Sequence, residues 1–223
     1  MPRRRQMGEK WHSLTVEEVM ERLNTGPRGL TDEEAARRLE IYGPNELREE
    51  KKKSKLLIFL EQFKNYLILI LLGATALSLI LGEVVDAITI LAIVFACAIM
   101  GFVEEYRSER ALELLKEMAA PTATVIRNGE EKEIPARELV PGDLVVLSTG
   151  DKVPADLRLV EAVNLRTNEA PLTGESTPVD KITEPLPEET PVPDRKNMAF
   201  SGTTVVYGRG KGVVVATGMN TEF

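Results

Sequence analysis

Tyr66 begins a stretch of 17 residues without a charged side chain, YLILILLGATALSLILG, which ends at Gly82, and Ala87 begins a second, AITILAIVFACAIMGFV, which ends at Val103. At about 1.5 Å per residue, each stretch forms about 25 Å of helix, close to the minimum that crosses a bilayer core. Residues 84–86 extend the second helix to about 20 residues. We therefore expect two transmembrane helices. The alternative is a pair of buried helices in a soluble core, where uncharged stretches of this length seldom occur.

The charges around the two stretches indicate their orientation. Arg107 and Arg110 follow the second stretch, and lysines precede the first at positions 51, 52, 53 and 55. The short connection carries Glu83 and Asp86 but no Lys or Arg. By the positive-inside rule, both ends of the hairpin lie in the cytoplasm.

The flanks of the hairpin are also predicted to be helical. Glu61 and Lys64 would each cost about 2.5–3.5 kcal/mol at the bilayer centre, so residues 56–63 are expected to form an amphipathic lead-in at the interface. After the second stretch, residues 104–118 contain no Gly or Pro, and Pro121 ends the pattern. We predict one helix of about 35 residues, roughly 50 Å long, whose last part leaves the membrane as a rigid stalk.

The first 45 residues contain a short repeat, LTVEE at residues 14–18 and LTDEE at residues 30–34. Each is a capping box, in which a Thr side chain caps a helix and a Glu three residues later binds back. Gly tolerates the left-handed backbone after a helix and Pro stops a helix. We therefore expect a hairpin of two helices that end at Gly26-Pro27 and at Gly43-Pro44.

From Thr122 onward the pattern changes to strands. Asn128-Gly129, a dipeptide typical of tight hairpins, separates a strand at 124–127 from its return through Ile134. Further strands are predicted at residues 144–147, 157–160, 203–207 and 212–215. Prolines at positions 178, 185, 187, 191 and 193 predict an exposed loop. The predicted fold class is therefore an α+β membrane protein with a helical N-terminus, a transmembrane hairpin with a cytoplasmic stalk, and a mainly β domain.

The composition excludes several kinds of site. With 28 Lys+Arg against 35 Asp+Glu, the net charge of −7 gives no electrostatic reason to bind nucleic acid. His12 and Cys97 are the sole members of their residue types, which excludes His-based triads, multi-His metal sites, internal disulfides and Cys-cluster zinc sites. Gly208–Gly212 resembles a phosphate-binding loop only superficially, because no Ser or Thr follows Lys211, and we expect a flexible hairpin turn there. No metal or cofactor ligands are assigned.

The most informative string is Leu172–Ser176, LTGES, which follows Asn168–Pro171. A Gly beside a carboxylate, with hydroxyl groups on both sides, lets the backbone and Glu175 approach a phosphate closely. The carboxylate can then orient or deprotonate a water. Taken alone, these common residues are typical of a solvated turn. The candidate catalytic residues are Thr173, Gly174, Glu175 and Ser176.

The order of the motifs resembles the N-terminal part of a P-type ATPase. The type II cation pumps are the most similar, in particular the calcium-transporting group, and the resemblance extends from about Leu14 to Phe223. The motifs that carry it, besides the hairpin, are GPNEL (43–47), PGD (141–143), GDKVPAD (150–156), LTGES (172–176), SGT (201–203) and TGMNTE (217–222).

The resemblance implies four parts. Residues 1–55 would be a cytoplasmic segment of the actuator domain, 56–103 the lead-in and first two transmembrane helices, 104–121 the stalk, and 122–223 the β part of the actuator domain, a distorted jelly roll. In this family the pump phosphorylates its own Asp on a separate domain, and the TGES loop dephosphorylates it. Glu175 would position and deprotonate the attacking water, with Thr173 and Gly174 shaping the loop. Pro154, Ala155 and Asp156 would form a neighbouring structural loop.

Members of the family that this sequence resembles also contain motifs and domains that this sequence lacks. The phosphorylation motif DKTGT is absent; the nearest string, Asp180–Thr183, has no Gly, so Asp180 is expected to be a loop residue. We expect an N-terminal fragment of a multi-pass membrane protein that neither hydrolyses ATP nor transports ions alone. ATP and Mg²⁺ would bind to phosphorylation and nucleotide-binding domains outside it. Its partners would be those domains, the lipid bilayer and the transported cation, but not nucleic acid.

The resemblance implies Ca²⁺ as the cargo, but with one departure. Reticulum calcium pumps have acidic residues in the first span just after a Glu-Gln-Phe string, whereas here Glu61–Phe63 precedes Lys64-Asn65. Pumps for Na⁺, K⁺, H⁺ or Mg²⁺ are therefore alternatives. An alternative from another class is a membrane-anchored, non-enzymatic binding module. A hydrolase that uses Glu175 alone would lack the usual partner groups.

Overall fold

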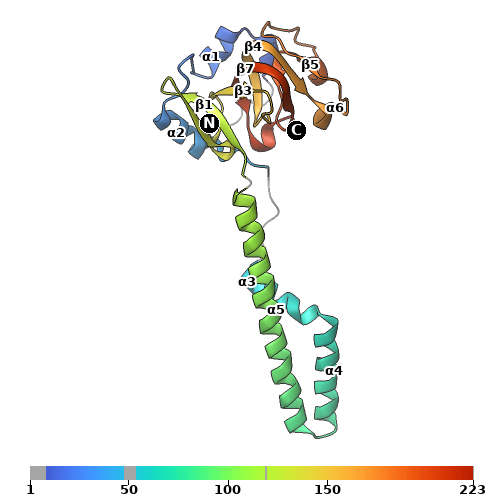
Figure 1. Cartoon of the computed structure of the whole chain (residues 1–223). Helices are drawn as coiled ribbons and strands as arrows, with labels where there is room; N and C mark the ends of the chain where they lie inside the picture. The colour runs from blue at the N-terminus through green and yellow to red at the C-terminus, as the bar shows by residue number, and fades with distance from the viewer. Residues whose placement is uncertain (1–8, 48–53, 119, 223) are drawn as a thin grey trace. The chain divides into compact units, whose positions relative to one another are not determined.

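The computed structural model describes residues 9–47, 54–118 and 120–222. The chain divides into two compact units (Figure 1). The first combines Met1–Glu49 with Ala120–Phe223, and the second comprises Glu50–Ala119. We call them the β unit and the helical-hairpin unit.

Two short helices begin the β unit, after a 3-10 turn at Trp11–Ser13 (η1). The first, α1, spans Val16–Arg22 and has the predicted capping box: the Glu18 N–H donates to Thr15 Oγ1 over 3.3 Å, and the Thr15 N–H donates to Glu18 Oε2 over 2.9 Å. It ends at Arg22 rather than at Gly26-Pro27, because Asn24 takes the left-handed backbone, with φ 46°, two residues before the glycine.

The second helix, α2, spans Asp32–Tyr42 and ends at the predicted Gly43. Thr31 caps it, since its Oγ1 accepts the Glu34 N–H over 3.2 Å. The second hydrogen bond of this predicted capping box, from the Thr31 N–H to the Glu34 side chain, is wrong. The Glu34 carboxylate binds Arg37 and Arg38 instead, and these hydrogen bonds lower the pKa of Glu34 to about 2.

Within residues 120–222, seven antiparallel strands form one sheet in the order β2-β1-β3-β7-β4-β5, with β6 also paired to β4. The predicted Asn128-Gly129 hairpin and the mainly β fold are confirmed, whereas the distorted jelly roll stays a prediction. Asp180 lies in β5, so its assignment to a loop is wrong. The strands are β1 (Thr122–Arg127), β2 (Glu130–Pro135), β3 (Leu144–Ser148), β4 (Asp156–Asn168), β5 (Val179–Asp180), β6 (Met198–Ala199) and β7 (Thr204–Ala216). Two 3-10 turns lie between strands, η3 (Ala136–Glu138) and η4 (Val192–Asp194), and a third, η5 (Gly218–Asn220), follows β7.

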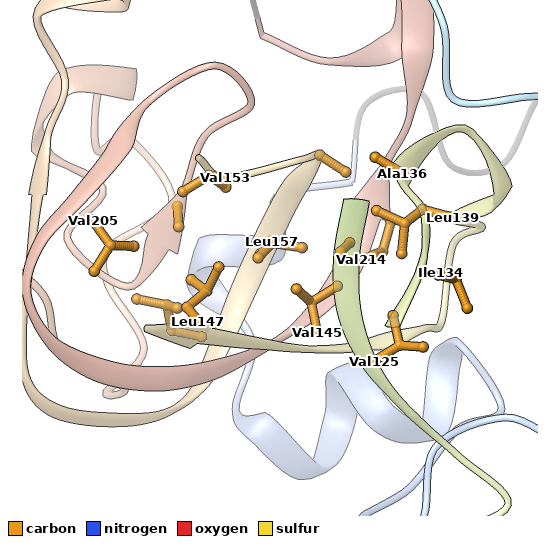
Figure 2. Packing of buried hydrophobic residues seen from close by; sticks show 14 of the residues in the cluster. Val125, Ile134, Ala136, Leu139, Val145, Leu147, Val153, Leu157, Val205 and Val214 are labelled. Atoms are coloured by element: carbon orange, nitrogen blue, oxygen red, sulfur yellow. The ribbon is translucent and has the colours of Figure 1, made fainter. Parts of the chain in front are cut away.

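Alternate residues of the strands enter two apolar clusters on opposite faces of the sheet, as the two-residue period of a strand requires. Val125, Val145 and Val214 belong to one cluster, and Figure 2 shows them packed with Leu157 and Leu139. The neighbouring Ile126, Leu144 and Val213 belong to the other cluster, where Trp11, Val19 and Leu23 from the N-terminal segment cover them. The segment from η1 to the end of α1 is therefore an integral part of this core, whereas α2 packs in a separate small cluster through Ala35, with Leu30 and Val140.

The predicted hairpin turn at Gly208–Gly212 is wrong, because these residues lie inside the continuous strand β7. Strand β4 pairs along them, with Ala162 opposite Gly210 and Leu159 opposite Gly212. A Cβ at Gly210 would lie 2.6 Å from the Glu161 carbonyl oxygen. The glycines therefore allow two bulged strands to lie close together. In the sequence, glycines that serve this purpose look the same as glycines of a turn.

Gly210→Ala should destabilise the β unit by about 1–3 kcal/mol, because the added methyl group overlaps the backbone of β4. Urea unfolding of the 223-residue chain in detergent, followed by Trp11 fluorescence, measures this loss. Gly26→Ala is the matched control, since a Cβ there meets no atom within 4 Å. Equal unfolding midpoints for the two variants would contradict the close-approach explanation.

The helical-hairpin unit contains α3 (Lys55–Glu61), a 3-10 turn at Gln62–Lys64 (η2), α4 (Tyr66–Ile80) and α5 (Val84–Met118). The predicted 35-residue helix is confirmed as α5. The lead-in predicted at residues 56–63 is helical, as α3 and η2, and α4 begins at Tyr66, where the first apolar stretch begins. The segment Lys55–Lys64 meets α4 at 67°. In the described chain, α5 is long and apolar enough to cross a membrane, and the bent pair passes the same test together.

Helices α4 and α5 lie side by side through Ile68, Val94 and Ala98, whose side chains are almost fully buried (Figure 1). Outside this seam the helices expose large apolar side chains. Tyr66 is 85% exposed, Ile80 81% and Val85 76%. Such a surface differs from the core helix of a soluble protein, which buries most of its apolar side chains.

Candidate functional site

The four candidate catalytic residues lie between β4 and β5. After β4 ends, the Asn168 side-chain oxygen accepts the Ala170 N–H over 3.0 Å and starts the one-turn helix α6, Ala170–Thr173. Pro171 stands in the first turn, where its missing N–H is harmless. The helix ends at Gly174 in the left-handed conformation, with φ 79° and ψ −3°. Gly is the residue that adopts this conformation without strain.

The Thr173 hydroxyl group organises the turn. It donates to the Glu169 carbonyl oxygen over 3.1 Å and accepts the Glu175 N–H over 3.2 Å. Thr173 and Gly174 therefore fix the backbone that carries Glu175. Glu175 and Ser176 are exposed, and within the described residues the Glu175 carboxylate has no hydrogen-bond or ion-pair partner. Its position leaves it accessible to a group that approaches from outside the β unit.

A buried ion pair lies at the base of this loop. Glu169, the residue before α6, pairs with Lys181, the residue after β5, and each side chain is 1% exposed. Burial lowers the pKa of Lys181, while the facing carboxylate opposes that shift. The sequence analysis missed both residues. Their separation of 12 positions matches no local motif, and only the pairing of β4 with β5 brings them together.

Asp156 of the GDKVPAD motif connects this motif to the SGT and TGMNTE motifs. Its carboxylate accepts the Ser201 N–H over 2.9 Å and the Glu222 N–H over 2.7 Å. Burial raises its pKa to about 6, although both hydrogen bonds favour the charged form. Asp156 is the first residue of β4, so its assignment to a loop is wrong, while these contacts agree with a structural role.

Asn45 makes a second junction of motifs. Its amide group donates to the carbonyl oxygens of Ala136, over 3.0 Å, and Pro154, over 2.8 Å, and its side-chain oxygen accepts the Gly218 N–H over 2.8 Å. The GPNEL, GDKVPAD and TGMNTE motifs therefore hold one another in place. Across the described ranges, no group of three or more His, Cys, Asp or Glu side chains is arranged to hold a metal ion.

Comparison with known proteins identifies the class. Residues 117–223 match the family described as the P-type ATPase actuator domain, and residues 11–78 match the cation transporter/ATPase N-terminus. The chain therefore belongs to the P-type ATPases.

Its relatives narrow the class. The chain is 48% identical over 214 residues to the calcium-transporting ATPase of Bacillus subtilis, covering 95% of this chain and 24% of that protein. It is 51% identical over 212 residues to the probable cation-transporting ATPase F of Mycobacterium tuberculosis, covering 95% and 23%. It is 42% identical over 220 residues to calcium-transporting ATPase 1 of Schizosaccharomyces pombe, covering 97% and 24%. The chain spans about a quarter of the length of the curated relatives it matches.

Proposed function

We propose that this chain forms the actuator domain and the first two transmembrane helices of an ATP-driven cation pump, with Ca²⁺ as the cargo. The observation that carries the proposal is the turn from Thr173 to Glu175, which presents an exposed carboxylate on an ordered backbone in a domain of the actuator family. ATP and Mg²⁺ would bind to domains beyond this chain and supply the phosphoryl group.

In this proposal the loop hydrolyses a phosphorylated Asp of the same pump. Glu175 accepts a proton from a water while the water oxygen bonds to phosphorus. The bond from phosphorus to the Asp carboxylate oxygen breaks, which releases inorganic phosphate and regenerates the carboxylate. Thr173 and Gly174 hold the backbone so that Glu175 can approach the phosphoryl group closely, and Ser176 offers a second hydroxyl group beside it.

The helical hairpin would couple this reaction to transport. The exposed apolar surface of α4 and α5 suits a lipid environment. Of the most apolar segment of α5, only 17% is buried within the described protein. The charge distribution at its ends supports a cytoplasmic N-terminus and a cytoplasmic β unit. The unbroken α5 would transmit movement of the actuator domain to the membrane, since a continuous helix does not absorb a rotation.

The cargo is proposed from the relatives and from the motif order. Two of the relatives described above are calcium-transporting ATPases, while the mycobacterial protein carries the broader name of a cation-transporting ATPase. Na⁺, K⁺, H⁺ and Mg²⁺ remain the alternative cargoes.

Phosphoenzyme formation in the complete protein tests the proposal. Membranes containing it are incubated with labelled ATP and Mg²⁺, with Ca²⁺ or with a calcium chelator, and the 223-residue chain serves as the negative control. We expect an acid-stable, hydroxylamine-sensitive phosphoprotein that requires Ca²⁺. Labelling that requires another cation would retain the pump and change the cargo. The absence of a phosphoprotein with every cation would overturn the proposal in favour of a membrane-anchored binding module.

A further inference from the structure

The loop that carries Glu175 is closed at its base by a buried contact. The chain leaves the sheet after Asn168, at the end of β4, and returns at Val179, at the start of β5. Thr167 pairs with Val179 across the two strands, and the Lys181 N–H donates to the Leu165 carbonyl oxygen over 2.9 Å. The Glu169–Lys181 ion pair lies immediately beneath this closure.

The surroundings of the pair are specific. Thr167 Oγ1 donates to Glu169 Oε1 over 3.1 Å, the same oxygen that Lys181 Nζ contacts, and Nζ lies 5.8 Å from the centre of the Phe200 ring. Among the described residues, Glu169 Oε2 has no hydrogen-bond partner although it is buried. Buried ion pairs of this kind contribute little net stability, because desolvation offsets their attraction. The pair is therefore better explained by what it positions than by the stability it adds.

Glu169 is connected to Glu175 by a short chain of hydrogen bonds. The Glu169 carbonyl oxygen accepts the Leu172 N–H and the Thr173 N–H, each over 2.9 Å, and it also accepts the Thr173 hydroxyl group. That hydroxyl group accepts the Glu175 N–H. A displacement of Glu169 therefore moves the backbone that carries the catalytic carboxylate.

We infer that Glu169 and Lys181 are positioning residues, whose buried ion pair holds the loop in the geometry that Glu175 needs for phosphoenzyme hydrolysis. This inference rests on the proposed function of the loop. A positioning role differs from a general structural role because substitution should impair one step of the reaction and leave another unchanged. Hydrolysis of the phosphoenzyme slows, whereas its formation from ATP, which the loop does not carry out, does not.

The protein provides a matched control on the same two strands. Arg166 and Asp180 form an ion pair of 2.6 Å between β4 and β5, with side chains 53% and 72% exposed. An exposed pair in water contributes little to geometry or stability. Asp180→Asn therefore removes a charge pair from the same loop base without removing a buried support.

The test measures phosphoenzyme decay in the complete protein after a chase with unlabelled ATP and a calcium chelator. Lys181→Met should slow decay by about 10- to 100-fold, the range expected when a catalytic group is misplaced by about 1 Å. The rate of phosphoenzyme formation should stay within about twofold of the parent protein. Glu169→Gln, which nearly preserves shape, should slow decay in the same direction. The double variant Glu169→Gln/Lys181→Met should decay faster than Lys181→Met alone, since no charge then stays unpaired. Asp180→Asn should decay like the parent.

Three results would overturn the inference. These are parent-like decay in both Lys181→Met and Glu169→Gln, equal slowing of formation and decay, or a loss in Asp180→Asn as large as in Lys181→Met. If Lys181→Met fails to accumulate in membranes, the Glu169→Gln result decides. Failure of the proposed function is recognised separately, because then the parent protein forms no phosphoenzyme or Glu175→Gln leaves decay unchanged.

Discussion

Glu175→Gln in the complete protein should slow phosphoenzyme hydrolysis by about 10²–10⁴-fold, or about 3–5 kcal/mol in activation free energy. Gln has nearly the shape of Glu but cannot accept a proton from the attacking water. The exposed position of Glu175 and its turn, held by Thr173, predict that the substitution leaves the fold intact. Formation of the phosphoenzyme from ATP should therefore continue, and the labelled protein should accumulate.

The measurement is a chase of labelled phosphoenzyme, sampled by acid quenching over time. Glu189→Gln is the matched control, because Glu189 is another exposed glutamate of the β unit and lies outside the loop. Its phosphoenzyme should decay at the parental rate. Parental decay in Glu175→Gln as well would remove Glu175 from the hydrolysis step, whereas loss of phosphoenzyme formation would assign it an earlier role.

The local part of the candidate site was accessible from sequence because its geometry depends on adjacent residues. The left-handed Gly174 and the hydroxyl group of Thr173 act within three positions of Glu175. The support beneath was not accessible. Glu169 and Lys181 meet only because β5 pairs with the end of β4, and a pattern of single residues contains no signal for that pairing.

The fold shows the same division between local and long-range causes. The Asn128-Gly129 hairpin follows from two adjacent residues. The 35-residue helix α5 follows from an apolar stretch that continues into residues 104–118, which contain no Gly or Pro. The strand through Gly208–Gly212 was misassigned because the glycines serve a partner strand about 50 residues away. The separation of the lead-in from α4 follows from the charges of Glu61 and Lys64, whereas the cap that starts α4, in which the Asn65 side chain accepts the Leu67 N–H over 2.9 Å, was not predicted.

Asp143→Ala should destabilise the β unit by about 3–5 kcal/mol, the usual loss when one partner of a buried ion pair is removed. Asp143 is fully buried in the PGD motif, and its two carboxylate oxygens accept from Arg127 over 2.8 Å and 2.7 Å. The same carboxylate accepts the Val140 N–H over 3.0 Å. The substitution leaves a buried guanidinium group without its counter-charge and a buried N–H without its acceptor.

Urea unfolding of the 223-residue chain in detergent, followed by Trp11 fluorescence, measures this loss. The chain has one Trp, and Trp11 packs in the β unit, so the signal reports that unit alone. With a slope of about 2–3 kcal/mol per M, the midpoint should fall by about 1–2 M. Asp180→Ala, which breaks an exposed ion pair with Arg166, should change stability by no more than about 1 kcal/mol. The double variant Arg127→Met/Asp143→Leu should lose less than Asp143→Ala, because it removes both charges together. If it loses as much, the stranded charge is not the cause, and the loss comes from packing around the PGD turn.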